Sequence, residues 1–372
     1  MTELHLAVGL DGYGWHPHAW RFAFAHNATG GSQLSGRYWA TLANIAERGL
    51  LDFLTIEDTL DVQPGRRPEI SPPRLAGRAD AVLVAARIAP VTEHIGLVPV
   101  ATVTHTEPFH VSKSIATLDY ISHGRAGWQV RVSGTAHEAA LFGRRSTPAG
   151  DELLDEAADA VEVVRRLWDS WEDGAVIRDV ATGRYIDRDK LHYIDFAGRY
   201  FSVKGPSITP RPPQGQPVVA ALAHTPRVCE FAAGSADVVF VTPQDGESLR
   251  AILADVNTAR RATGRALKVY ADVVVSLVHH PLAPAAGISS DAHVFVGHTT
   301  DLADLLLDWQ DAGVDGVRLR PAVNAIDLPA IANDLVPLLQ RAGRFRTGYR
   351  DGETLRERLG LASAPNRLTV SS

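Results

Sequence analysis

The sequence predicts an α/β fold, a (β/α)8 TIM barrel with lid insertions, formed as one domain over residues 1–372. Three observations predict it: short apolar segments alternate with amphipathic ones, there are eight apolar segments, and these are apolar throughout rather than at every second residue. Strands that are apolar on both faces are typical of parallel strands covered by helices. Eight such strand–helix units close into a barrel whose reaction site lies at the carboxyl ends of the strands.

The individual elements follow from these patterns in chain order. Short β-rich runs predict the eight strands at residues 4–10, 52–58, 94–103, 126–132, 217–223, 237–243, 268–278 and 315–321. Apolar residues at helical spacing predict helices at residues 37–49, 78–90, 109–122, 153–171 and 301–313. The tail, residues 354–372, is expected to form a short helix followed by frayed chain.

The regular alternation breaks between residues 172 and 216. This stretch is polar and rich in Gly and Pro, and connections of this length are usually lids or disordered linkers. A second irregular stretch, residues 59–74, follows the second strand and is expected to form another wall of the barrel mouth. Aromatic residues in the first stretch argue against disorder, so we expect an ordered lid over the mouth; they are Tyr185, Tyr193, Phe196, Tyr200 and Phe201.

The composition is typical of a soluble globular protein. With 45% hydrophobic residues, the 372-residue chain can bury a large core, and a net charge of −6 does not favour nucleic acid or an anionic membrane as a partner. A single cysteine, Cys229, cannot form an internal disulfide. The first residues lack a secretion signal, and no stretch approaches the roughly 20 apolar residues that cross a bilayer. We therefore expect a cytoplasmic protein.

Several common catalytic motifs are absent from the sequence. There is no GxxxxGK[ST] phosphate loop, no HExxH, no paired CxxC and no GxSxG nucleophile elbow. The segment "GLDGYG" at residues 9–14 lacks the GxGxxG spacing of a dinucleotide-binding turn. The histidine pairs His16/His18 and His279/His280 have no nearby ligating carboxylates, so we expect no metal site.

Small hydroxyl residues and one acid lie at the ends of the predicted strands. Asp58 ends the second strand, where it fits a turn cap as well as a ligand contact. Thr102 ends the third strand, where β-branched residues are ordinary strand formers. After the fifth strand, Thr225 is a suitable N-cap and Pro226 fits a first helical turn. Backbone N–H groups at such a helix start bind anions, and in a barrel this place is a candidate phosphate site.

One stretch resembles a known family closely. The run "EPFHVSKSIATLDYISHGRAGWQVRVS" (107–133) resembles the signature of the bacterial-luciferase-like flavin monooxygenases, in the branch that contains nitrilotriacetate, dibenzothiophene-sulfone and long-chain alkane monooxygenases. Shorter stretches agree in order along the chain, at residues 14–21, 52–60, 198–219 and 313–319. The resemblance covers nearly the whole chain, and it implies a barrel with lid insertions, in agreement with the strand count.

The resemblance also implies a reaction, a cofactor and partners. Members of the family bind reduced FMN, supplied by a separate NAD(P)H:flavin reductase, and form with molecular oxygen a flavin (hydro)peroxide that transfers one oxygen atom to a small organic substrate. They commonly form homodimers. Two alternatives stay open: a deazaflavin (F420)-dependent oxidoreductase that transfers hydride without consuming oxygen, and a catalytically silent flavin-binding protein.

Candidate site residues follow from the same resemblance. His16 and His110 match histidines of the family and are candidates for proton transfer or for polarising the substrate, since histidine titrates in the useful range. A structural or phosphate-contacting role is open for each. Asp58 and Thr102 match an acid and a hydroxyl residue of the flavin pocket. Trp128 is expected either in the upper layer of the barrel, supporting the flavin, or as a core tryptophan without flavin contact.

Two departures from the family concern the flavin. Gln129 stands where relatives usually carry Asn, and both amides offer an acceptor and a donor. After the fifth strand the chain reads "ALAHTPRV" (221–228) where relatives read approximately QAGxSxxG, with Thr225 at the serine position. Without the glycines the backbone approaches a phosphate less closely, so weaker FMN binding is expected, with His224 as a compensating donor. Three arginines can attract a carboxylate or sulfonate but are explained more simply as surface salt bridges: Arg211, Arg318 and Arg320.

Overall fold

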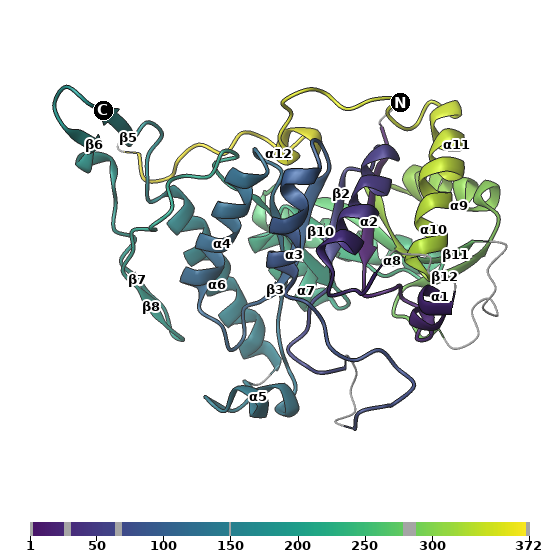
Figure 1. Cartoon of the computed structure of the whole chain (residues 1–372). Coiled ribbons are helices and arrows are strands. Elements are labelled where there is room, and N and C mark those ends of the chain that lie inside the picture. The colour runs from purple at the N-terminus through teal and green to yellow at the C-terminus, as the bar shows by residue number, and fades with distance from the viewer. Residues whose placement is uncertain (1–2, 26–30, 64–68, 149, 278–287, 370–372) are drawn as a thin grey trace.

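Eight parallel strands form a closed barrel in the computed structural model, which describes residues 3–25, 31–63, 69–148, 150–277 and 288–369 (Figure 1). Strand β1 pairs with β2 and β13, and β10 pairs with β9 and β11, so the hydrogen bonding continues around the whole circle. The predicted barrel is confirmed, and each predicted strand corresponds to one barrel strand; Val278 lies outside the described residues. The barrel strands are β1 (His5–Leu10), β2 (Phe53–Ile56), β3 (Gly96–Thr102), β4 (Gly127–Arg131), β9 (Val218–Ala223), β10 (Val238–Val241), β11 (Lys268–Leu277) and β13 (Gly316–Pro321).

Helices cover the outer face of the barrel. The five predicted helices are confirmed and correspond to α2 (Gly36–Arg48), α3 (Ala81–Ile88), α4 (Pro108–Ile121), α6 (Gly150–Asp169) and α9 (Thr299–Ala312). Helix α7 (Pro226–Ser235) begins where Thr225 and Pro226 predict a capped helix. Helices α8 (Gly246–Thr263), α10 (Asn324–Ala330) and α11 (Val336–Arg341) were not predicted, and the last two are joined by a π-helical turn at Ile331–Leu335. Three short helices complete the set: α1 (Ala19–Ala25), α5 (Ala136–Phe142) and α12 (Leu355–Arg358).

The interior of the barrel is filled by aromatic rings at one end. Phe53, Phe240 and Tyr270 pack with their ring centroids 5.4 to 6.1 Å apart. Leu355 of α12 belongs to the same cluster, so α12 closes the barrel at the amino ends of the strands, at the top of Figure 1. We call this the closed end. The carboxyl ends of the strands, at the bottom of Figure 1, form the open end, where barrel enzymes carry their sites.

Part of the signature run builds the closed end rather than a ligand site. The carboxylate of Asp119 accepts the backbone N–H groups of Ala126 and Gln214 at 3.1 and 3.0 Å, and burial raises its pKa to about 6. Gly124 adopts a φ of +84°, which favours glycine. Gly127 faces the interior, where a Cβ atom would lie 2.9 Å from the carbonyl oxygen of Val218. Both glycines are therefore required by backbone geometry at the start of β4.

The insertion at residues 172–216 does not cover the open end. It forms two hairpins, β5 (Val176–Asp179) with β6 (Arg184–Ile186) and β7 (Phe196–Ala197) with β8 (Ser202–Val203). Arg211 holds it to the end of α6, with Nε 3.3 Å from the Asp169 carboxylate, and to the tail, donating to the carbonyl oxygen of Ala364 at 2.6 Å. The expected lid is therefore corrected. The segment joins the end of a helix to the start of a strand, and both lie at the amino ends of the strands, opposite the reaction face.

Two other regions differ from expectation. The strand β12 (His293–Gly297), which the sequence analysis missed, pairs with the second half of β11, beyond the residues of β11 that pair with β10. The tail is held in place as far as Thr369 rather than frayed. Asn366 donates to the carbonyl oxygen of Asp169 at 2.8 Å, and Arg367 pairs with the carboxylate of the same residue at 3.0 Å.

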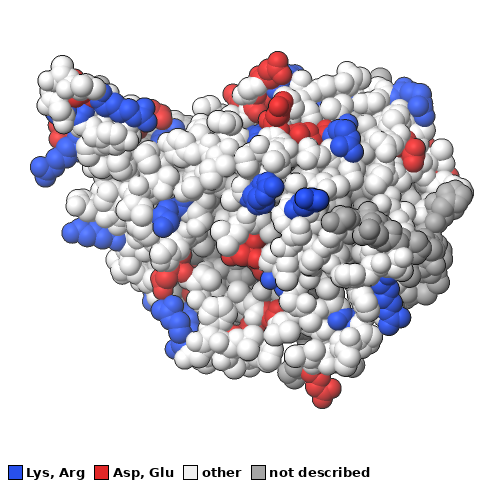
Figure 2. Space-filling model, viewed as in Figure 1, with Lys and Arg blue, Asp and Glu red and all other residues white. Residues whose placement is uncertain are grey.

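The surface carries charges of both signs. Figure 2 shows acidic and basic side chains spread over this face without a continuous basic area, and it shows acidic side chains within a hollow toward the open end. Among the helices that the structure describes, none is both long enough and apolar enough to span a bilayer.

Candidate active site

Buried charges form a layer inside the barrel, on the open-end side of the aromatic rings. Arg318 of β13 donates to both carboxylate oxygens of Asp272 of β11, at 2.7 and 2.6 Å, and both side chains are fully buried. The guanidinium carbon of Arg318 lies 3.7 Å from the ring centroid of Phe240. Arg320, two residues further along β13, also contacts Asp272. We call Arg318, Arg320 and Asp272 the polar layer.

The polar layer corrects the interpretation of the arginines as surface ion pairs. Arg318 is fully buried and Arg320 is 2% exposed, because alternate residues of β13 point into the barrel. Arg211 lies near the closed end, beside Asp169. Arg318 and Arg320 form ion pairs inside the barrel, because the carboxylate of Asp272 contacts both guanidinium groups.

The polar layer fixes the orientation of Gln129. Arg318 donates from Nη1 to Oε1 of Gln129 at 2.7 Å and to the hydroxyl oxygen of Thr55 at 3.2 Å. The amide nitrogen of Gln129 makes no hydrogen bond to any other residue in the described ranges. A primary amide carries two N–H donors. Gln129 is thus held by its oxygen and left as a hydrogen-bond donor in the barrel interior.

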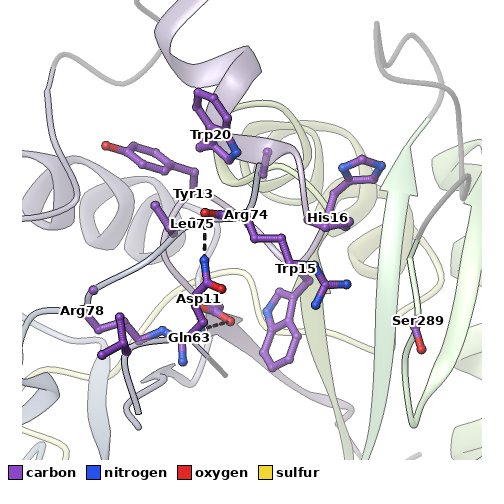
Figure 3. A pocket seen from close by; sticks show the side chains of 15 residues that line it. Asp11, Tyr13, Trp15, His16, Trp20, Gln63, Arg74, Leu75, Arg78 and Ser289 are labelled. Atoms are coloured by element: carbon purple, nitrogen blue, oxygen red, sulfur yellow. Dashed lines mark hydrogen bonds and ion pairs between the residues drawn. The ribbon is translucent and has the colours of Figure 1, made fainter. Parts of the chain in front are cut away.

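A cavity of about 250 Å³ lies at the open end (Figure 3). Its walls come from the loop after β1, from α1, and from the segment between β2 and α3, where residues 62, 63 and 74 confirm the predicted wall. Asp11 is paired with Arg78, with its two oxygens 2.5 and 2.6 Å from Nη2. Burial nevertheless raises the pKa of Asp11. Other side chains that line the cavity are Tyr13, Trp15, His16, Trp20, Val62, Arg74, Leu75 and Ser289.

Trp15 connects the cavity to the polar layer. Its indole N–H donates to the carbonyl oxygen of Gly9 at 2.8 Å, and the guanidinium carbon of Arg320 lies 4.5 Å from its ring centroid. Arg320 also donates to Asp291 at 2.8 Å, and the Asp291 carboxylate lies 3.6 Å from Nδ1 of His224. Burial acts to raise the pKa of Asp291, but Arg320 outweighs it and the pKa is lowered. Direct contacts therefore link the cavity and the polar layer to His224, which precedes the N-cap of α7.

The structure separates the two candidate histidines. His16 lines the cavity, and its Nδ1 accepts the backbone N–H of His18 at 3.0 Å. A neutral His16 therefore carries its proton on Nε2. His110 lies in the first turn of α4, is exposed, and does not line the cavity. Of the two, only His16 lies where a ligand in the cavity can reach it. His279 and His280 lie outside the described residues.

The candidate residues at the strand ends have distinct surroundings. The carboxylate of Asp58 accepts the backbone N–H groups of Thr59 and Ala81 at 2.7 and 3.0 Å, so it anchors the start of α3, and burial raises its pKa. Thr102 is buried at the end of β3 and faces the interior by alternation with Val98. Asp58 therefore acts as the turn cap, one of the two roles considered for it, while the hydroxyl of Thr102 makes no hydrogen bond within the described residues.

Trp128 takes the second of the two positions expected for it, in the core and not in the upper layer of the barrel interior. It is fully buried in the core between strands and helices, which it shares with Ile115 and Ala116 of α4, and its indole N–H donates to the carbonyl oxygen of Ala101 at 3.1 Å. Gly127 and Gln129 occupy the interior positions on either side of it. Strand alternation thus turns Trp128 away from the barrel interior toward the surrounding helices, so Trp128 is a core tryptophan.

The start of α7 has the capping pattern that the sequence predicts. Thr225 is the N-cap, its hydroxyl oxygen accepts the N–H of Val228 at 3.4 Å, and Pro226 is the first helical residue. His224 is exposed, and its Nδ1 lies 3.2 Å from the hydroxyl of Thr242. Both side chains stand at the open end.

Two residues of the open end escaped sequence reasoning. His105 follows β3 with a φ of +67°, is buried, and has no hydrogen-bond partner for either ring nitrogen among the described residues. Its ring stacks on Phe142 at 5.3 Å, and burial lowers its pKa. Arg74 lines the cavity. In the sequence, only their positions in loops that follow predicted strands indicated that His105 and Arg74 lie at the open end. Within the described ranges no three histidine, cysteine or acidic side chains gather as metal ligands.

The geometry defines a barrel enzyme with a cavity at its open end, and comparisons with known proteins give the class. The model of the luciferase-like monooxygenase family matches residues 19–283. Nitrilotriacetate monooxygenase component A of Aminobacter aminovorans is 31% identical over 100% of this chain and 99% of its own length. N-acetyl-S-(2-succino)cysteine monooxygenase of Bacillus subtilis (strain 168) is 29% identical over 98% of both chains.

A solved structure agrees with these sequence matches. Riboflavin lyase RcaE, crystallised with modified FMN and riboflavin, superposes with a TM-score of 0.83 at 25% identity, over 97% of each chain. The chain belongs to the luciferase-like monooxygenase family. It is a flavin-dependent monooxygenase of that family.

Proposed function

We propose that this chain is the oxygenating component of a two-component system, which uses reduced FMN and molecular oxygen to insert one oxygen atom into a small organic substrate. A separate NAD(P)H:flavin reductase would supply the reduced FMN, and the word "component" in the name of the Aminobacter relative supports this arrangement. One observation carries the proposal: the cavity at the open end adjoins the polar layer, because Trp15 of the cavity wall contacts Arg320 of the polar layer.

The residues present fit the chemistry of reduced FMN. The flavin ring offers carbonyl and nitrogen acceptors, and Gln129 offers an amide donor that is already held in place by Arg318. The flavin phosphate requires N–H donors, and the start of α7 offers backbone N–H groups beside Thr225 and His224. The imidazole of His224, which is exposed beside Thr242, adds a ring nitrogen that can donate to a phosphate.

Each group of the chain then has a task in the reaction. Reduced FMN, when bound, supplies the electrons that activate dioxygen. Arg318 positions the Gln129 amide, and Trp15 and Trp20 contribute apolar walls that exclude water. His16, whose Nδ1 accepts the backbone N–H of His18, can hold or donate a proton through Nε2 at the cavity wall. His105, with both ring nitrogens unpaired among described residues, is a second candidate for proton transfer.

The test is an anaerobic titration of the protein with reduced FMN and, separately, with reduced deazaflavin, followed by rapid mixing with oxygen and a panel of small organic compounds. We expect binding of reduced FMN and substrate-dependent oxygen uptake. Replacing Gln129→Leu removes the amide donor and should slow oxygenation about a hundredfold. Gln129→Asn keeps an amide and should retain more activity. Wild-type rates in Gln129→Leu, or hydride transfer from reduced deazaflavin to a substrate without oxygen uptake, would contradict the proposal.

A homodimer and a cytoplasmic location stay predictions from the family resemblance. Light scattering of the purified chain measures the first, and a mass of about twice 40.1 kDa is the expected result.

A further inference from the structure

The charged groups of the cavity do not balance one another. Of its three charged side chains, Asp11 and Arg78 form an ion pair with contacts of 2.5 and 2.6 Å. Arg74 makes no ion pair and no side-chain hydrogen bond with any residue in the described part of the chain. Among the described residues that line the cavity, Arg74 is therefore an arginine without a counter-ion. Figure 3 shows the Arg74 side chain extending into the cavity toward Trp15.

The backbone that carries Arg74 is fixed although its side chain is unpaired. Gln63 donates from Nε2 to the carbonyl oxygens of Arg74 and Ser71 at 3.1 and 2.9 Å, and its Oε1 accepts the N–H of Ser71 at 2.7 Å. The backbone N–H of Arg74 donates to Ser71 O at 3.1 Å. Trp20 adds a further link by donating to the carbonyl oxygen of Pro73 at 3.0 Å. These contacts hold the base of Arg74 at the cavity wall, which lowers the entropy lost when a ligand binds it.

The remaining walls of the cavity are aromatic or apolar. They are formed by Tyr13, Trp15, Trp20, Val62 and Leu75. Such walls favour an apolar body. The size limits that body, because a cavity of about 150 Å³ holds a benzene ring and this cavity measures about 250 Å³. One ring or a short chain with one substituent fits such a volume.

We propose that the cavity binds a monoanionic organic substrate, a carboxylate or sulfonate with an apolar body of about one ring, and that Arg74 binds the anionic group. A neutral substrate would cover the guanidinium without replacing its water, which costs free energy, whereas an anion forms charge-assisted hydrogen bonds with it. A dianion is disfavoured because Asp11 lines the same cavity and the only unpaired cation among the described residues there is Arg74. This inference deepens the proposed function by naming its substrate class.

The experiment compares two probes of equal shape on the full-length protein, without flavin or oxygen. Binding of 4-methylbenzoate and of its neutral analogue 4-methylbenzamide is measured by isothermal titration calorimetry and by ligand-observed NMR. We expect the wild-type chain to bind the acid about tenfold or more tightly than the amide. Arg74→Gln should reduce this ratio to about one, and Arg74→Lys should keep part of it.

Arg21→Gln is the matched control. Arg21 is exposed beside the cavity, with its guanidinium carbon 5.5 Å from the ring of Trp20, and it does not line the cavity. Its removal tests whether any nearby positive charge is enough, and the acid-to-amide ratio should stay at the wild-type value. Circular dichroism checks that the variants are folded. The acid-to-amide ratio of the wild-type chain tests the inference even if a variant does not fold.

Two results would overturn the inference: equal binding of acid and amide to the wild type, or an unchanged ratio in folded Arg74→Gln. Because no flavin is present, these results concern the substrate class alone. The oxygen-uptake assay tests the proposed function separately, so a failure of one is distinguishable from a failure of the other.

Discussion

Two buried aspartates, one at each end of the barrel, have different partners and opposite pKa shifts. At the closed end, Asp52 contacts His5 and Arg346 at 3.0 and 2.5 Å. Burial alone would raise its pKa, but these two partners outweigh burial and lower it to about 2. At the open end, Asp327 accepts the backbone N–H groups of Leu277 and Val323 at 2.9 and 2.7 Å and has no cationic partner among the described residues. Burial raises its pKa to about 7.

The difference teaches that the partners of a buried aspartate, and not its burial alone, set the direction of its pKa shift in this barrel. Asp237 faces Arg165 at 2.9 Å as Asp52 faces Arg346, and its pKa is lowered too, whereas Asp119, held by backbone N–H groups at the same end, has a raised pKa. At the open end, Asp327 has no cation and Arg74 has no anion within the described residues. Burial without a cation is costly for Asp327, whereas Arg74 is exposed and keeps its water, and both groups are free to meet a proton or a ligand.

The largest effect is expected from a substitution at the closed end. Arg125 donates to the carbonyl oxygens of four residues, Ala89, Thr92, Ile95 and Ser122, at 2.7 to 3.0 Å. Arg125→Met leaves these buried acceptors without a donor and should lower the free energy of unfolding by about 3–5 kcal/mol. Urea denaturation measures the loss, with the exposed Arg350→Met as control. A loss below about 1 kcal/mol would show that the closed end does not depend on this network.

The two aspartates should give stability opposite dependences on pH. An unfolded aspartate has a pKa of about 3.9. Between about pH 4 and 7, native Asp327 keeps a proton that the unfolded chain has released, so its contribution to stability falls as pH rises through this window. Asp52, with a native pKa of about 2, loses its contribution as pH falls below about 4.

Substitution of each aspartate measures its part of that dependence. Asp327→Asn should remove about 4 kcal/mol of the change in unfolding free energy between pH 4 and 7.5. Asp52→Asn should act below pH 4 instead, and the exposed Asp304→Asn should leave the profile unchanged. Equal profiles for wild type and Asp327→Asn would refute the contrast between the two ends.

The smallest effect is expected at the start of α7. Thr225→Ala removes the N-cap hydroxyl that accepts the Val228 N–H and should cost about 1 kcal/mol of stability. It should also weaken the binding of reduced FMN, whereas Thr225→Ser keeps the hydroxyl and should preserve both. Thermal unfolding and fluorescence titration with reduced FMN measure the two effects. Loss of stability without any loss of affinity would separate the cap from the proposed phosphate site.

The sequence by itself determined the barrel and much of its chemistry. Apolar runs and helical spacing located all eight barrel strands, and Thr225 followed by Pro226 predicted a capped helix that the structure contains. These features depend on local patterns, which a chain carries whatever its neighbours are. The segment at residues 59–74 was also predicted correctly as a wall, because a loop that follows a barrel strand lies at the reaction face.

Only the tertiary structure decided which side chains meet. Trp128 and Gln129 are adjacent in sequence, yet strand alternation sends the first to the helices and the second to Arg318, 189 residues away. Arg318 and Arg320 resemble surface residues in the sequence, but strand alternation turns them into the barrel, where Asp272 on the neighbouring strand pairs with both. Arg74 resembles any loop arginine in the sequence, and only the folded chain shows that it lines a cavity without an ion-pair partner among the described residues. Pairing and burial depend on contacts between distant segments, and a local pattern does not encode them.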